Sequence, residues 1–189
     1  MGDNSRNNMI YLIGVFDHAI QCFTELWPPV GSKGNVIRIG TKRLCVTEIP
    51  PQFKKYQLPF QKYLNKKINT NRNISYIFEE WPWVLYEKPV NSIAQNLTLT
   101  MTLNIKYKQI DILERDGGNK ADQNNLRETL WLQNIKTGLS SSSHHENAII
   151  ILGNDHLDSF QSKLINEGYE HMVIINEIEL RSELDKFLV

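Results

Sequence analysis

Two Asp-His pairs are the residues of this chain whose types and positions best suit acid-base chemistry. Asp17-His18 and Asp155-His156 each follow an apolar run that ends in a glycine. A histidine exchanges its proton near neutral pH, and an adjacent carboxylate can hold one tautomer of its ring. In the alternative interpretation, each aspartate only caps the N-terminus of a following helix. The pairs therefore predict either a site or two helix caps.

Further carboxylates and an arginine also follow β-prone runs. Glu79-Glu80 comes directly after residues 74–78, and Glu114-Arg115 follows the run at residues 106–112. Histidine and carboxylate side chains suit a divalent metal such as manganese, zinc or cobalt. Such a metal would lower the pKa of a bound water and so supply a nucleophile.

Two mechanisms are open for these side chains. With a metal, His18, His156 and Glu80 are the candidate ligands, Glu79 or Asp155 is the general base, and Arg115 stabilises negative charge. Without a metal, a histidine is the base, a carboxylate fixes its tautomer and an arginine holds an anion. The full candidate catalytic set is His18, His156, Glu79, Glu80, Arg115 and Asp155.

The elements that would position these residues alternate between strand and helix. Short apolar or β-prone runs predict strands at 9–13, 74–78, 106–112, 148–152 and 171–175. Helical spacing and capping signals predict helices at 17–26, 53–68, 92–103, 122–137, 158–167 and 177–188. Two β-prone runs within 35–49 predict a small hairpin. This order predicts an α/β fold with a mostly parallel sheet of about five strands and helices on both faces.

Local signals predict several element ends and one buried helix face. Ser92 is expected to cap the helix at 92–103, and Gly168 to end the helix at 158–167. The helix at 122–137 is expected to turn Leu126, Leu130 and Ile135 toward the core. Residues 1–8 are expected to be disordered, and the serine-rich stretch 137–147 to form a mobile loop.

The predicted sheet would bring the candidate residues together. In a parallel sheet the strand-to-helix loops open on one edge, and ligands bind there. The two Asp-His pairs, Glu79-Glu80 and Glu114-Arg115 all follow strands. We therefore expect them to meet at the C-terminal edge of the sheet, although they are far apart in the sequence.

Composition bounds the class of protein. A chain of 189 residues suits one α/β domain. Lys plus Arg equals Asp plus Glu at 21 each, so the basic excess typical of nucleic-acid binding is missing and no nucleic-acid partner is expected. No apolar run reaches the length of a membrane span, so no membrane partner is expected either. Two cysteines without motif spacing, and a polar start, predict a reducing, cytoplasmic compartment.

The spacing of these segments resembles that of the TraB/ChaN superfamily, which includes the TIKI proteases and the erythromycin esterases. Gly153-Asn154-Asp155-His156 matches the family's late Gly-x-x-His segment, and residues 14–18 are one residue longer than the early one. Residues 127–132 are similar to a helix of small, uncharacterised members. The resemblance implies a site of His18, Glu79 or Glu80, Arg115 and His156. Members are metal-dependent proteases, metal-free esterases or haem-binding proteins.

Three functions follow as hypotheses. The first is a small hydrolase, metal-assisted or using His/Glu acid-base chemistry, that acts on a polar bond of a small-molecule or peptide substrate. The second is a non-catalytic domain that binds a small anion or haem at the same edge. The third is an interaction protein whose histidine pairs are structural and whose exposed apolar patch includes Trp81, Trp83 and Val84.

Overall fold

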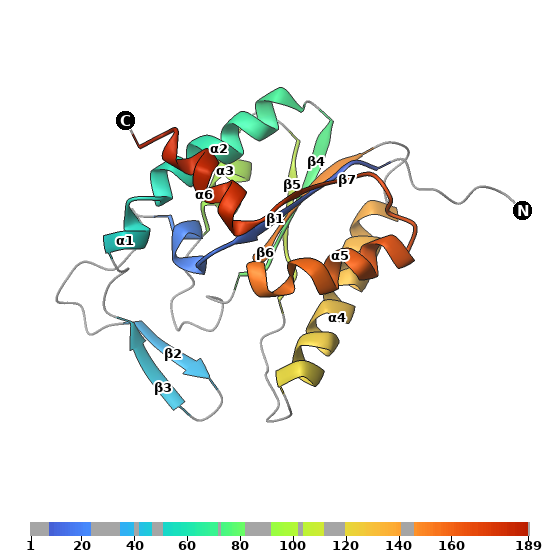
Figure 1. Ribbon diagram of the computed structural model, residues 1–189, viewed down its shortest axis with the longest axis horizontal. Helices are drawn as coiled ribbons and strands as arrows, with labels where there is room; N and C mark the ends of the chain where they lie inside the picture. The colour runs from blue at the N-terminus through green and yellow to red at the C-terminus, as the bar shows by residue number, and fades with distance from the viewer. Residues whose placement is uncertain are drawn as a thin grey trace, which may run out of the picture.

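Five parallel strands form the central sheet, in the order β5-β4-β6-β1-β7 (Figure 1). The computed structural model describes residues 8–23, 35–39, 42–46, 51–71, 73–81, 92–101, 104–111, 120–140 and 146–188. The strands of the sheet are β1 (Ile10–Val15), β4 (Ile74–Glu79), β5 (Lys106–Gln109), β6 (Asn147–Gly153) and β7 (Met172–Ile175). A separate antiparallel hairpin pairs β2 (Asn35–Ile39) with β3 (Lys42–Val46). The predicted α/β fold is therefore confirmed.

Helices cover both faces of the sheet (Figure 1). One face is covered by α2 (Gln57–Thr70), α3 (Ile93–Thr100) and α6 (Glu177–Asp185), and the other by α4 (Lys120–Ser140) and α5 (Leu157–Asn166). Three shorter helices are α1 (Pro51–Lys54), η1 (His18–Gln21) and η4 (Asn154–His156). None of the helices in these described ranges is both long and apolar enough to span a membrane.

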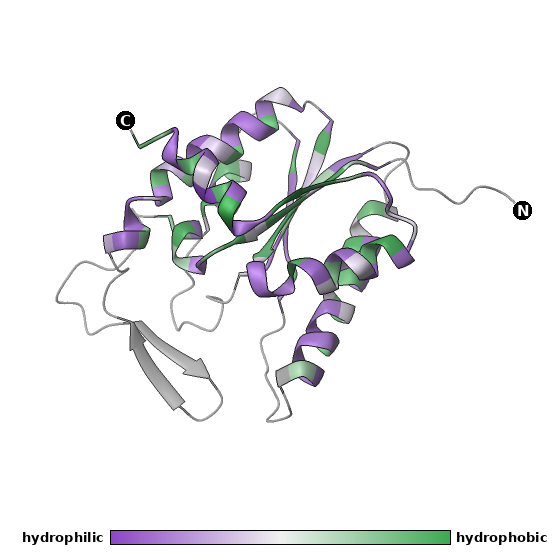
Figure 2. Ribbon diagram, viewed as in Figure 1, coloured by the Kyte–Doolittle hydropathy of each residue, from purple (hydrophilic) through white to green (hydrophobic). Residues whose placement is uncertain are grey.

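Two apolar cores explain why the central strands are continuous apolar runs. Ile13 of β1 and Ile151 of β6 pack toward α2, α3 and α6, whereas their neighbours Leu12 and Ile150 pack toward α4 and α5. Each such side chain is fully buried, and burying one contributes about 1.5–3 kcal/mol relative to exposure. In Figure 2 the apolar colouring accordingly follows the sheet and the inner sides of the helices.

The predicted end signals have clear counterparts. Ser92 caps α3, because its hydroxyl oxygen accepts the Gln95 amide hydrogen at 3.0 Å. Gly168 follows α5 with a φ of 84°, a left-handed conformation that favours glycine. The amide of Tyr169 closes that turn by donating to the Leu164 carbonyl at 3.1 Å.

Other predictions were wrong in extent or in orientation. The helix expected at 17–26 is only the four-residue η1, and 24–30 lie outside the described residues. The loop expected at 137–147 starts later, because α4 continues to Ser140; 141–145 are not described. Of the stretch expected to be disordered, only Asn8 is described. Leu126, expected inside, is 57% exposed.

The connections of the sheet lead to opposite faces on each side of β6. The connection after β1 leads to α2 on one face, and the connection after β6 leads to α5 on the opposite face. β6 lies between β1 and β4, and the chain after β4 also leads to the face of α2, through α3. Because neighbouring loops diverge at such points, the C-terminal edge there is the usual place for a ligand in open α/β sheets.

Candidate functional site

Glu80 is the centre of a polar cluster at this edge. It follows β4 directly and is 3% exposed, and three different elements of the fold contact its carboxylate. Its Oε1 accepts from Arg127 Nη2 at 2.5 Å, and its Oε2 accepts from the Gly153 amide at 2.7 Å. The Nε2 of His18 lies 3.8 Å from Oε1. Glu80 thereby links the ends of β1, β4 and β6 with α4.

His18 is held by a chain of buried polar groups. Asp17 caps η1 by accepting the Ala19 amide hydrogen at 2.7 Å, which fixes the backbone at His18. His18 Nδ1 lies 2.6 Å from Gln21 Oε1, and Gln21 Nε2 donates to Glu79 Oε1 at 2.7 Å. Because the amide nitrogen serves Glu79, its oxygen must accept from His18 Nδ1–H. This assigns the proton of the neutral ring to Nδ1 and leaves the lone pair on Nε2.

Glu79 anchors that chain from inside the sheet. It is fully buried, and its carboxylate accepts hydrogen bonds from Gln21, from the Ser92 hydroxyl and, at 2.7 Å, from the Tyr107 hydroxyl. Burial raises the pKa of Glu79 to about 7, although these three hydrogen bonds and the nearby His18 favour the charged form. Ser92 therefore has two functions, as the cap of α3 and as a donor to Glu79.

The neighbouring Glu80 has the opposite tendency. Burial disfavours its charge, but His18, Arg127 and the Gly153 amide together hold the pKa of Glu80 below its usual value. Arg127 is also shared, since its Nε and Nη2 donate to Asp111 Oδ1 at 3.0 and 2.9 Å. Two carboxylates thus neutralise and orient one buried guanidinium.

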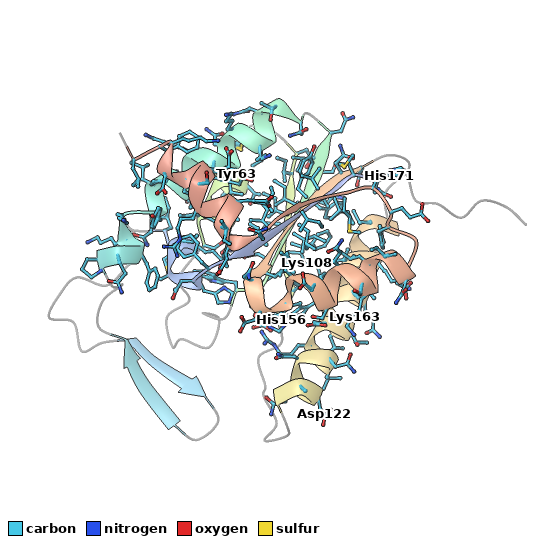
Figure 3. The ribbon with its side chains drawn as sticks, viewed as in Figure 1. Tyr63, Lys108, Asp122, His156, Lys163 and His171 are labelled. Carbon is cyan, nitrogen blue, oxygen red and sulfur yellow. The ribbon has the colours of Figure 1, made fainter. Side chains whose placement is uncertain are left out.

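His156 is the more enclosed of the two histidines. Its Nδ1 lies 2.9 Å from Glu128 Oε1, which also accepts from the Ser159 hydroxyl at 2.7 Å. Its Nε2 lies 3.4 Å from Arg127 Nη1, and the ring packs edge-on against Trp131 with the centroids 4.9 Å apart. The side chain is 7% exposed, against 26% for His18. Figure 3 shows His156 at the start of α5, on the side that faces α4.

Gly153 leaves the space in which these side chains meet. A Cβ at this position would lie 3.3 Å from His18 Nε2 and 3.4 Å from Glu80 Oε2. Any larger residue would press on the two groups that approach each other there. The glycine that ends the β6 run is thus needed for close approach, because its backbone φ is an ordinary −61°.

The structure brings together some of the predicted site residues and separates others. His18, His156 and Glu80 meet, and Glu79 joins them through Gln21. Asp17 is a helix cap, as the alternative interpretation proposed. Asp155 is exposed. Within the described stretch 146–188, neither η4 nor α5 has a side-chain cap, so Asp155 is not the helix cap of the alternative interpretation, and its role as a general base stays a prediction. Arg115, like Glu114, lies outside the described residues.

Sequence reasoning missed the two charged residues of α4 that complete the cluster. Arg127 and Glu128 are 5% and 3% exposed, whereas the preceding Leu126 points outward. The signal was available, because the buried residues Trp131, Leu132, Ile135 and Leu139 form a helical stripe. Extending that stripe one turn toward the N-terminus reaches 127 and 128. The prediction placed the apolar Leu126 inside instead of these two charged residues, since buried charges are unexpected unless they are paired.

The expected metal ligands are not arranged around an ion. His18 Nε2 and His156 Nε2 lie 3.8 and 3.9 Å from Glu80 Oε1, but the Arg127 guanidinium already bonds to that oxygen. Among the residues that the structure describes, no three His, Cys, Asp or Glu side chains are grouped to hold a metal. Arg127 therefore bonds to the carboxylate that the metal hypothesis assigns as a ligand, and the metal site stays a prediction.

Comparison of the chain with protein-family models, with curated proteins and with solved structures finds no match. The resemblance to the TraB/ChaN superfamily consequently stays a prediction, and the functional argument depends on the geometry of the site.

Proposed function

We propose that this protein is a hydrolase that uses His18 as a metal-free general base at the C-terminal edge of the sheet. The observation that carries the proposal is the chain Glu79–Gln21–His18, which assigns the lone pair of the ring to Nε2. A base needs a fixed tautomer and access to substrate, and His18 combines both because a quarter of its side chain is exposed.

In the proposed reaction, His18 first accepts a proton and later donates it. His18 Nε2 takes a proton from water while the water oxygen forms a bond to the electrophilic carbon of an ester or amide. The carbon–leaving-group bond then breaks, and the protonated His18 donates its proton to the leaving group. Glu80, whose Oε1 lies 3.8 Å from Nε2, stabilises the imidazolium formed between these steps.

The charges around the site favour a neutral or cationic substrate. Glu80, Asp111 and Glu128 pair with the cations Arg127 and Lys163, and the buried carboxyl group of Glu79 is adjacent in the sequence to Glu80. The guanidinium of Arg127 is already bonded to Asp111 and Glu80, so it is not available to hold an anion. This arrangement supports the metal-free mechanism. Arg115, the arginine of the sequence-based hypothesis, lies outside the described residues, so its role stays a prediction.

Activity against a panel of neutral, cationic and anionic chromogenic esters and amides tests the proposal. The His18→Gln variant should lose about 10²–10⁴-fold in rate on whichever compound the parent hydrolyses, the usual contribution of a positioned base. His171→Gln is the matched control, because His171 is exposed and immediately precedes β7, at the opposite edge of the sheet (Figure 3). Its rate should equal that of the parent.

Three results would change the assignment. A His18→Gln variant as active as the parent would rule out the general base. Loss of activity on chelation, with recovery on adding manganese, zinc or cobalt, would restore the metal mechanism. If the parent hydrolyses no compound but a ligand raises its melting temperature, and His18→Gln abolishes that rise, the same edge is a binding site without catalysis.

A further inference from the structure

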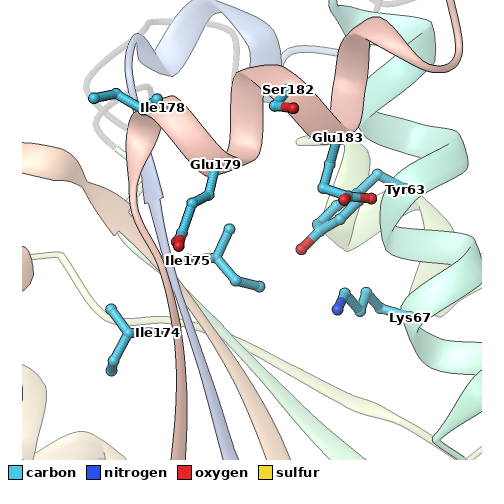
Figure 4. A pocket seen from close by; sticks show the side chains of 8 residues that line it. All are labelled: Tyr63, Lys67, Ile174, Ile175, Ile178, Glu179, Ser182 and Glu183. Carbon is cyan, nitrogen blue, oxygen red and sulfur yellow. The ribbon is translucent and has the colours of Figure 1, made fainter.

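A second pocket, of about 490 Å³, lies between α2, α6 and the edge strand β7 (Figure 4). None of its lining residues belongs to the cluster around Glu80. Its wall combines apolar side chains of β7 and α6 with the hydroxyl of Tyr63, the ammonium of Lys67 and two glutamates of α6.

Tyr63 presents a buried hydroxyl that lacks a partner. The residue is 1% exposed, and its hydroxyl has no hydrogen-bond partner among the described residues. Leaving a buried hydroxyl unbonded costs about 1–3 kcal/mol, so such a group calls for an explanation. Burial raises the pKa of Tyr63, which keeps the phenol protonated and able to donate. Figure 4 shows the oxygen directed into the opening of the pocket.

Lys67 points its ammonium toward the same opening (Figure 4). One turn after Tyr63 on α2, its Nζ lies 5.5 Å from the centroid of the Tyr63 ring and 5.7 Å from that of Tyr11. Among the described residues, no carboxylate forms an ion pair with this ammonium. Two donors, one of them charged, therefore converge on a position that suits a carboxylate.

The opposite wall supplies complementary chemistry. Glu179 and Glu183 line it from α6. Glu179 Oε2 accepts the Asn176 amide hydrogen at 3.1 Å and Glu183 Oε1 pairs with Lys186, so the second oxygen of each carboxylate has no hydrogen-bond partner among the described residues. These two acceptors disfavour a multiply charged anion such as phosphate. They suit an ammonium group. Ile175 and Ile178 add an apolar surface, and Ile178 is 75% exposed. A ligand that satisfies all three features carries a carboxylate, an ammonium and an aliphatic side chain.

We propose that this pocket binds a free aliphatic α-amino acid, with its carboxylate on Tyr63 Oη and Lys67 Nζ, its ammonium toward Glu179 and Glu183, and its side chain on Ile175 and Ile178. The proposal is independent of the hydrolase assignment, because it shares no residue with that site.

Binding of leucine to the full chain, followed by NMR chemical-shift titration, tests this assignment. Leucine should shift the resonances of the lining residues and raise the melting temperature. Isocaproate lacks the ammonium and isoamylamine lacks the carboxylate, so both should bind at least about tenfold more weakly, the factor that corresponds to one lost charged hydrogen bond.

Variants locate the site. Tyr63→Phe and Lys67→Met should each weaken leucine binding about tenfold or more. Lys66→Met is the matched control, since Lys66 is exposed, adjacent in sequence and absent from the pocket wall, and it should bind like the parent. Tyr63→Phe removes only an unbonded oxygen and should keep the fold.

Several outcomes would overturn the proposal. It is refuted if leucine shifts no lining resonance, or if leucine binds Tyr63→Phe and Lys67→Met as tightly as the parent. Isocaproate binding as tightly as leucine would remove the role of the ammonium and of the two glutamates.

Discussion

Glu79 and Glu80 are adjacent in the sequence, and replacing each by glutamine should change stability with opposite dependence on pH. Glu79 is buried with a raised pKa, whereas His18, Arg127 and the Gly153 amide hold the pKa of Glu80 below its usual value despite burial. Glutamine keeps the size and removes the charge. The two variants therefore isolate the contribution of each carboxylate to the free energy of unfolding.

The expected magnitude for Glu79 follows from its pKa. A value of about 7 in the folded protein against 4.5 for an ordinary glutamate corresponds to about 3 kcal/mol, since a tenfold change in proton affinity is ~1.4 kcal/mol. Between these pH values the folded state binds more protons than the unfolded state. The contribution of Glu79 to the free energy of unfolding is therefore largest below pH 4.5, falls as the pH rises, and is constant above about pH 7. Because glutamine does not titrate, the unfolding free energy of Glu79→Gln minus that of the parent should rise by about 3 kcal/mol over this interval.

Glu80 has the reverse sign. Its contribution is present above the usual glutamate pKa and is lost as the pH falls through the lower pKa of the folded protein. At neutral pH, Glu80→Gln should cost about 3 kcal/mol, because Arg127 keeps only Asp111 as a charged partner. That deficit should shrink toward acid pH.

Urea unfolding of the parent and the two variants, repeated from pH 4 to pH 8, measures these differences directly. Subtracting the unfolding free energy of the parent at each pH cancels the contributions of the histidines and of all other titrating groups that the variants share. The reasoning about Glu79 fails if the difference between Glu79→Gln and the parent is flat across the interval or decreases with rising pH. Parallel curves for the two variants would refute the opposite roles of the neighbouring carboxylates.

Substitutions at three further positions test the site, the end of α5 and the core. Gly153→Ala should displace the partly exposed His18 ring, so hydrolytic rate should fall while the melting temperature changes little; an unchanged rate would contradict the close approach. Gly168→Ala should cost about 1 kcal/mol in urea unfolding, because alanine is strained at a φ of 84°, and Gly168→Asn should cost less. Phe160→Ala should cost about 3–5 kcal/mol, because the ring is fully buried against Trp131; a loss under 1 kcal/mol would mean that this core is loosely packed.

Local sequence signals were sufficient for the elements and for the edge at which the site lies. The run at β6 is apolar because both faces of that strand are buried, and this pattern is visible without knowledge of any partner. The cap at Ser92 and the turn at Gly168 depend on residues within a few positions. His18 and Glu80 were placed together because parallel strands end at a common edge.

The tertiary structure alone decided which charged groups complete the site. Arg127 and Glu128 are tolerated inside because Asp111 and Glu80 accept hydrogen bonds from the arginine and His156 contacts the glutamate, and these partners come from three separate segments. Helical periodicity considers only the hydrophobicity of each residue and takes no account of such pairing, so it predicted that Leu126 faces the core. The lone pair of His18 is likewise set by Gln21 and Glu79, from two different elements. The sequence by itself thus determined the sheet and the edge at which the candidate site lies, because these depend on local burial patterns; the charge partners required long-range contacts.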